Sequence, residues 1–248
     1  MKRKPTSTAG RLAMAVAAIL IISAQILPAQ DFTVRMKDED GKNIATRYVS
    51  RNAVRNVSSE PVDTDVIYRL DTGKIIALNH KQQTYSEIAA AEVRLLMEKR
   101  LLMEKKQNAI SPEKQAAMRR LGSGGAASVT KIGAGETIAG YATEKYSAKA
   151  PMSQGEIWVA PALEVPPGYY DMVTSFAAAE VGGWGLIFKE MKEKQIKGYL
   201  LKSVEAVTIT PMMKGMAFTQ VATSVEKGPI PASTFEPPAG YQKVARAR

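Results

Sequence analysis

The sequence predicts an α+β protein in which an antiparallel sheet carries helices on one face. Short β-rich runs recur along the chain without the regular strand–helix–strand alternation of a parallel sheet. Two stretches change instead to a helical period. The first run sets the strand pattern, because apolar and polar residues alternate from Phe32 to Lys37, as in a strand with one side in water.

Turn residues place the remaining strands of the first half. Val66 to Leu70 and Lys74 to Asn79 flank Asp71-Thr72-Gly73, a turn whose glycine accepts the positive φ of a tight hairpin. The strands expected in this half are 32–37, 44–50, 53–58, 66–70, 74–79 and 84–87.

A helical insertion is expected over about 87–121. No Gly or Pro interrupts the stretch from Ile88 to Ala109, and Ser111-Pro112 then starts a second helical piece as N-cap and first residue. A tandem hexapeptide at 95–106 does not fit the helical period, so the helix is apolar on more than one side. It could cover the sheet, act as a lid over a ligand, or bind a partner helix or membrane surface.

The second half repeats the strand pattern around two further helices. A glycine-rich joint at 122–125 precedes expected strands at 128–132, 136–149 and 155–160. Helices are expected over about 169–194, followed by two long strands at 198–210 and 216–226. Together these elements predict a single domain over 31–248.

The first thirty residues have the order of a secretory signal peptide. Basic residues at 2–4 and 11 precede a short apolar run from Leu12 to Leu27. We expect cleavage between about Ala24 and Gln30, and the alternative is an uncleaved anchor. The chain is therefore expected to be exported.

Composition narrows the classes of function. The chain has no cysteine, which excludes disulfides, thiolate metal sites, cysteine nucleophiles and an acylated cysteine. His80 is the single imidazole, and no nucleophile, base and orienting group are spaced as a catalytic set. Without the four basic residues of the leader, 30 basic and 24 acidic residues leave a net charge of +6, which suits an anionic membrane surface. We expect no enzyme activity, no cofactor, no metal and, given export, no nucleic-acid partner.

Turn glycines, strand aromatics and edge prolines form an ordered set that covers most of 31–248 except 92–128. The set comprises Val66 to Asp71, Lys74-Ile75, Thr84 to Glu87, Ile138 to Tyr141, Glu144 to Tyr146, Glu156 to Val159, Lys197 to Tyr199, Ile230 to Ala232, Phe235, Pro237, Gly240-Tyr241 and Val244. It resembles an uncharacterised bacterial exported family, a domain of unknown function similar to LolA/LppX-like and RseB-like proteins. The resemblance implies an open half-barrel, a strongly curved antiparallel sheet with helices over its concave face and an apolar cavity between them.

We therefore expect a periplasmic binding module for a hydrophobic ligand, such as a lipid or acyl chain, that contacts the membrane only transiently. The alternative is an envelope structural or signalling module that binds a protein partner through the sheet edge or the 88–121 helix. The expected wall residues are Val34, Met36, Val66, Tyr68, Leu70, Ile76, Leu78 and Tyr141 from the sheet, with Leu95, Leu102 and Met103 from the lid. Their spacing leaves open which side of each strand faces inward.

Overall fold

The computed structural model describes residues 31–59, 64–93, 95–96, 99, 127–150, 153–177, 184–207 and 216–245. The expected signal peptide, most of the helical insertion and its residues Leu102 and Met103 lie outside the described residues.

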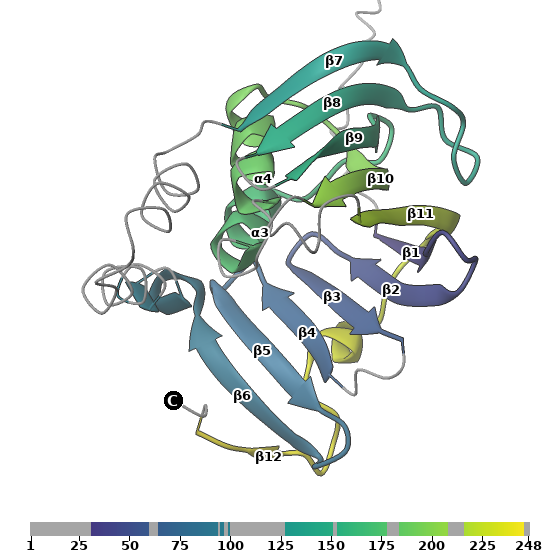
Figure 1. The fold of residues 1–248 in the computed structure, drawn as a ribbon. Coiled ribbons are helices and arrows are strands. Elements are labelled where there is room, and N and C mark those ends of the chain that lie inside the picture. Colours follow the sequence, from purple (N-terminus) through teal and green to yellow (C-terminus); the bar gives the residue numbers. More distant parts are fainter. Residues whose placement is uncertain are drawn as a thin grey trace, which may run out of the picture.

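The described chain is mostly β and forms one open sheet of twelve strands (Figure 1). The strands of the first half are β1 Phe32–Lys37, β2 Asn43–Val49, β3 Ala53–Ser58, β4 Thr64–Arg69, β5 Lys74–Asn79 and β6 Thr84–Ala89. Those of the second half are β7 Ser128–Ala134, β8 Glu144–Ala150, β9 Ser153–Ala160, β10 Tyr199–Val207, β11 Met216–Lys227 and β12 Gln242–Lys243. The helices are α3 Tyr169–Ala177, α4 Trp184–Glu193 and the short 3-10 helix η2 Ala232–Phe235.

Two meanders are joined side by side in the sheet order β12-β6-β5-β4-β3-β2-β1-β11-β10-β9-β8-β7. Every neighbouring pair is antiparallel except β12, which adds to β6 in parallel. The long-range step is β1 with β11, which brings the first strand of the domain beside one of the last. Strands β7 and β12 remain as the two edges, so the sheet does not close.

The predicted strands agree with the observed ones to within two residues at each described end, apart from the run at 136–149 and the C-terminal strand β12. Residues 208–210 of the strand predicted at 198–210 lie outside the described residues. Strand β6 continues to Ala89 because that residue pairs with Lys74. The run predicted at 136–149 is a strand only from Glu144, because Ala139 and Gly140 take positive φ and close a tight turn between Ile138 and Tyr141. The C-terminal strand β12 was not predicted, since two residues carry too little pattern.

Strand pairing assigns side chains to the two faces of the sheet. Val34 pairs with Arg47, Arg47 with Asn56, and Asn56 with Val66, so all four point to one side, here called the cavity face. Arg55, Ile67 and Ile76 pair on the other side, here called the outer face.

Each face carries its own apolar core. On the cavity face, Val34 and Met36 are buried with Tyr199 and Leu201 of β10. Helix α4 packs on the second meander, because Ile187 and Met191, four residues apart, lie against residues of β7, β8 and β9.

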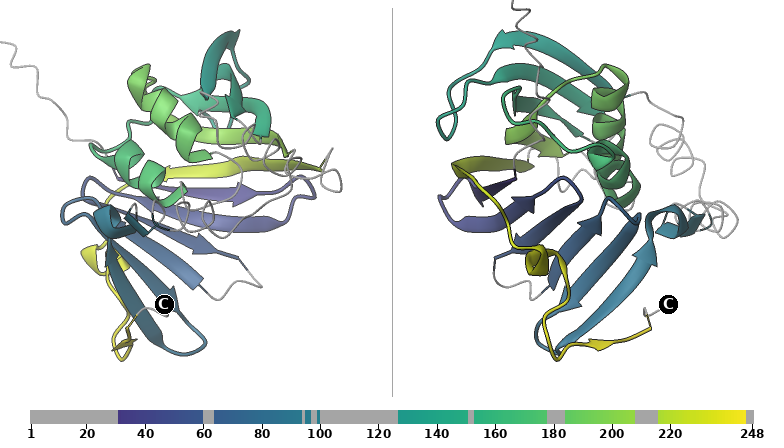
Figure 2. Two further views of the ribbon diagram at one scale, coloured as in Figure 1. Left: turned by 60° about the vertical axis from the view of Figure 1, so that its left-hand side comes forward. Right: turned by 180° about the vertical axis from the view of Figure 1, so that it is seen from behind.

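On the outer face, Phe235 of η2 packs on Ile67, Ile76 and Leu78. The C-terminal segment that carries η2 crosses this face on its way to β12, as the view from behind shows (Figure 2). Among the described residues, no helix is long and apolar enough to cross a bilayer.

Candidate functional site

A cavity of about 230 Å³ lies between the cavity face of the sheet and helices α3 and α4. Residues of β2, β3, β4, β10 and β11 line one side and residues of both helices line the other. The lining residues are Arg47, Val54, Asn56, Tyr68, Tyr169, Val173, Trp184, Phe188, Tyr199, Leu200, Ser203, Glu205, Phe218 and Gln220.

Helical spacing turns the apolar wall toward the cavity. Tyr169 and Val173 of α3 are four residues apart, as are Trp184 and Phe188 of α4. The rings of Trp184 and Phe188 lie 5.7 Å apart, and that of Tyr199 lies 6.0 Å from that of Tyr169. Six of the lining residues are aromatic, so this wall offers broad, rigid apolar surface.

The pairing of β10 with β11 places polar side chains on the sheet side of the cavity. Ser203 pairs with Gln220 and Glu205 pairs with Phe218, which places the four side chains in two adjacent rows on the cavity face. Behind Glu205, Gly155 of β9 allows an unusually close approach, because a Cβ built there would lie 1.9 Å from the carbonyl oxygen of Val204.

Three buried side-chain atoms on the cavity wall have no hydrogen-bond partner in the described structure. They are Asn56 Oδ1, Glu205 Oε1 and the Tyr199 hydroxyl oxygen, the last of which lies close enough to Arg47 and Tyr169 to raise the pKa of both. The other oxygen of Glu205, Oε2, accepts a hydrogen bond from Trp184 Nε1 at 2.5 Å. Buried polar groups in native proteins are nearly always paired with protein atoms or ordered water, so these atoms are positions on the cavity wall where a water molecule or a ligand can bind.

Arg47 contributes a fixed positive charge to the cavity. Its Nη2 donates a hydrogen bond to Gln220 Oε1 at 3.2 Å, and it forms no ion pair with a carboxylate among the described residues. Burial works to lower the pKa of this guanidinium, but the neighbouring Tyr199 and Tyr169 raise it, and the net change is upward. Burial also raises the pKa of Tyr169 well above its usual range, so the phenol is neutral.

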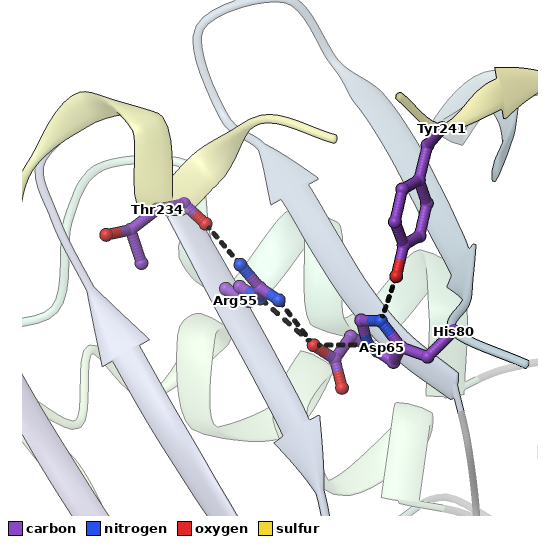
Figure 3. Close-up of polar contacts among 5 residues, drawn as sticks. All are labelled: Arg55, Asp65, His80, Thr234 and Tyr241. Carbon is purple, nitrogen blue, oxygen red and sulfur yellow. Dashed lines mark hydrogen bonds and ion pairs between the residues drawn. The ribbon is translucent and has the colours of Figure 1, made fainter. Parts of the chain in front are cut away.

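A second polar cluster lies on the outer face and ties the C-terminal segment to the sheet (Figure 3). Asp65, whose side chain is 3% exposed, receives hydrogen bonds from Arg55 Nε and Nη2 at 3.1 and 2.6 Å on Oδ2. His80 Nε2 lies 3.0 Å from the same oxygen, and its Nδ1 lies 2.7 Å from the hydroxyl of Tyr241. Arg55 Nη1 also donates to the carbonyl of Thr234 at 3.0 Å. We call Arg55, Asp65, His80 and Tyr241 the C-terminal clasp.

The contacts of His80 define the tautomer of its neutral ring. In the neutral imidazole, Nε2–H donates to Asp65 while Nδ1 accepts from the Tyr241 hydroxyl, which satisfies all three groups. His80 was interpreted from the sequence as a strand-end or turn residue, and it does lie directly after β5. Its partners come from β4 and from the C-terminal segment, 161 residues away in the case of Tyr241.

Larger hollows occur at the rims of the sheet but are shallow. One of about 560 Å³ lies beside the edge strand β7, and one of about 470 Å³ lies between the C-terminal segment and β4 to β6. Among the described residues, no group of three or more His, Asp or Glu side chains is arranged to hold a metal ion.

The structure divides the predicted wall residues into several groups. Tyr68 lines the cavity, and Val66 and Leu70 pack beside it as partly buried residues. Val34 and Met36 lie on the cavity face but are fully packed in the core.

The other predicted residues lie elsewhere. Ile76 and Leu78 point to the outer face, because Ile76 pairs with Ile67 rather than with Val66. Tyr141 lies in the 138–141 turn with the Lys227 ammonium 5.3 Å from its ring. Leu95 is 52% exposed.

Sequence reasoning missed Arg47, Asn56 and Glu205 as site residues. A signal existed for Arg47, which shares strand parity with the buried Ala45 and Val49 and so is a charged residue in an inward-facing row. The same kind of signal existed for Glu205, which shares strand parity with the buried Tyr199 and Leu201 of β10.

Comparison with known proteins gives a family but no activity. The model of a family described as a domain of unknown function (DUF4412) matches residues 32–241. No curated protein matches the chain. Among solved structures, the chain is similar to that of PNGF-II in the C2 space group, with a TM-score of 0.44 and 12% identity, over 87% of this chain and 30% of that chain. A likeness at that level carries no argument about function.

Proposed function

This chain belongs to the DUF4412 family, a domain of unknown function, and we propose from its own structure that it is a non-catalytic binding module that holds a hydrophobic ligand in the cavity. We also propose that the fold is a half-barrel like those of LolA-like and RseB-like proteins, with α3 and α4 over its concave face. The open sheet with its two free edges supports that interpretation.

One observation carries the proposal. The aromatic and aliphatic wall formed by α3 and α4 faces Asn56 Oδ1 and Glu205 Oε1, two buried acceptor atoms that have no hydrogen-bond partner in the described structure. Each unpaired buried polar atom costs about 1–3 kcal/mol of stability, so a folded core that served only for packing would gain by closing or pairing them. A ligand with an apolar body and polar atoms at one end would offset that cost.

The size of the cavity limits what it can hold. Drug-sized pockets start at about 300 Å³, so a complete lipid would extend beyond this cavity. The proposal is therefore a small amphipathic molecule or the end of a longer acyl chain.

The proposed place of action is the periplasm, after removal of the leader. The net charge of +6 expected for residues 31–248 supports brief contact with an anionic membrane surface, where such ligands occur. Fractionation of cells that produce the full chain, with N-terminal sequencing of the mature protein, tests this part.

Native mass spectrometry of gently purified protein, followed by extraction of bound small molecules, tests ligand binding. The matched variants are Val173→Trp, which fills the cavity from α3, and Leu186→Trp, which adds the same side chain at an exposed position of α4. Ligand should be lost in the first and kept in the second. A protein that is always empty and excludes apolar dyes would contradict the proposal.

A second candidate function is recognition of an envelope protein. It is favoured by Leu95 and Leu96, which are 52% and 44% exposed on the helix after β6, and by Ile132, 55% exposed on the edge strand β7. A pull-down from membranes with the chain lacking 88–121 separates the two functions, because a lid would lose ligand retention whereas a docking helix would lose the partner.

A further inference from the structure

We infer that the ligand of the cavity carries a primary ammonium group, which binds the carboxylate of Glu205 while its apolar body lies against α3 and α4. This inference rests on the proposed function and adds the chemical class of the ligand. It is argued from the unpaired atoms, from the charge of Glu205 and from the rings beside it.

The unpaired atoms call for hydrogen-bond donors. Asn56 Oδ1 and Glu205 Oε1 can only accept, and the hydroxyl oxygen of Tyr199 can accept as well as donate. A carboxylate or phosphate group on the ligand brings acceptors and would leave these atoms unpaired. A hydroxyl or an ammonium group brings donors.

Charge favours ammonium over hydroxyl. The side chain of Glu205 belongs to a residue only 9% exposed, and in the described structure it forms no ion pair. A buried carboxylate without a cation is costly, and a neutral hydroxyl would pair the oxygen but not the charge. A primary ammonium provides both at once.

The surroundings of Glu205 suit a cation. Trp184 donates its Nε1–H to Glu205 Oε2, so the indole lies beside the carboxylate, and the ring of Phe188 lies 5.7 Å from that of Trp184. Aromatic rings attract cations through their negative faces, and the effect grows where water is excluded.

Arg47 does not reverse this preference. Although it is cationic and lines the same cavity, its guanidinium already donates to Gln220, and none of its nitrogens is among the unpaired buried atoms of the described structure. The buried atoms of the cavity that have no hydrogen-bond partner in the described structure are thus all oxygen atoms that can accept a hydrogen bond. An anionic ligand could pair with the remaining N–H donors of Arg47, but it would leave the carboxylate of Glu205 without a cation.

The test uses three probes of equal chain length at pH 7, namely n-hexylamine, 1-hexanol and hexanoate, titrated into the wild-type full chain by calorimetry. Hexylamine should bind at least tenfold more tightly than hexanol, and hexanoate should bind least. Glu205→Gln should weaken hexylamine by about tenfold to a hundredfold and change hexanol less than twofold, because the substitution removes a charge-assisted hydrogen bond. The matched control is Glu156→Gln, which removes an exposed carboxylate on the neighbouring strand β9 and should change neither.

The outcomes separate the inference from the function beneath it. Equal affinity for hexylamine and hexanol, or tightest binding of hexanoate, overturns the ammonium assignment while the cavity remains a binding site. No binding of any probe, together with an empty protein in native mass spectrometry, overturns both. The ranking of the probes on the wild-type chain decides the question even if Glu205→Gln does not fold.

Discussion

Replacing Asp65 by Asn tests whether the C-terminal clasp holds the domain together. The substitution keeps the size of the side chain and one acceptor oxygen but removes the negative charge. Asp65 Oδ2 is the point at which Arg55 and His80 meet, with contacts of 2.6, 3.1 and 3.0 Å. The Asn variant would leave the guanidinium of Arg55, 16% exposed, without its counter-charge.

The burial of this ion pair sets the expected loss in free energy of unfolding. Removing one partner of a buried ion pair costs about 3–5 kcal/mol, because the remaining charge stays buried without compensation. Domains are stable by about 5–15 kcal/mol, so Asp65→Asn should remove about a fifth or more of the free energy of unfolding. With a urea m-value of about 2–3 kcal/mol/M for a chain of this size, the unfolding midpoint should fall by roughly 1–2 M.

A matched control is the ion pair at the end of β4 and the turn that follows it. Arg69 and Asp71 form the same kind of pair, with Nη2 2.7 Å from Oδ2, but their side chains are 29% and 33% exposed. The hydrogen bond from Arg69 lowers the pKa of Asp71, so this pair contributes above the unfolded pKa near 4 and the contribution is lost as pH falls through the folded pKa. At pH 7, Asp71→Asn should cost less than about 1 kcal/mol.

The assay is urea unfolding followed by circular dichroism at pH 7, with amide hydrogen exchange at 228–245 as a local readout. Exchange in this segment should accelerate in Asp65→Asn, because Thr234 and Tyr241 are held through Arg55 and His80. If the midpoints of the Asp65 and Asp71 variants agree within about 0.3 M, burial does not govern the strength of the clasp and the reasoning is refuted.

Three further predictions concern packing and titration. Gly155→Ala should destabilise the folded protein by at least about 1–3 kcal/mol, because the added Cβ would meet the Val204 carbonyl oxygen at 1.9 Å. The control Gly228→Ala, whose Cβ would have no atom within 4 Å, should leave stability nearly unchanged, and thermal unfolding of both variants measures the difference. Burial raises the pKa of Tyr170 to about 12, so the neutral phenol stabilises the fold fully below the unfolded pKa near 10, and this contribution is lost as pH rises toward 12. Between about pH 10 and 12, the urea midpoint of Tyr170→Phe should therefore fall less steeply with pH than that of the wild type. Equal slopes would disprove the assignment. Leu78→Ala should cost about 2–5 kcal/mol of stability without changing probe affinity in the folded protein, because Leu78 is fully buried on the outer face; a loss of affinity in calorimetry would place it at the cavity after all.

Local sequence determined where most strands begin and end. Alternation over 32–37 and the Asp71-Thr72-Gly73 turn, with Gly73 at φ +64°, each act over a few residues. Hairpin partners are adjacent in the chain, so their pairing follows from these signals. The same holds for α3 and α4, whose apolar spacing was visible at 169–194.

The cavity depended on pairings that no local pattern contains. Arg47 donates to Gln220 across 173 positions because β1 pairs with β11, and nothing near either residue specifies that neighbour. The wall residues predicted from the first meander were accordingly divided between two faces. Val66 and Ile76 lie on neighbouring strands, yet only the register decides that they point in opposite directions.

The sequence by itself established a cysteine-free chain and predicted a β-rich domain with two later helices, together with a leader-like start and an apolar helical insertion that stay predictions. The tertiary structure decided which side chains meet in the cavity, because bulges at Arg35/Met36 and Leu200/Lys202 each shift strand parity by one residue. One such shift reverses the face of the sheet to which a strand's side chains point relative to those of its neighbour. The chemistry of the site therefore follows from long-range register, which depends on the whole sheet.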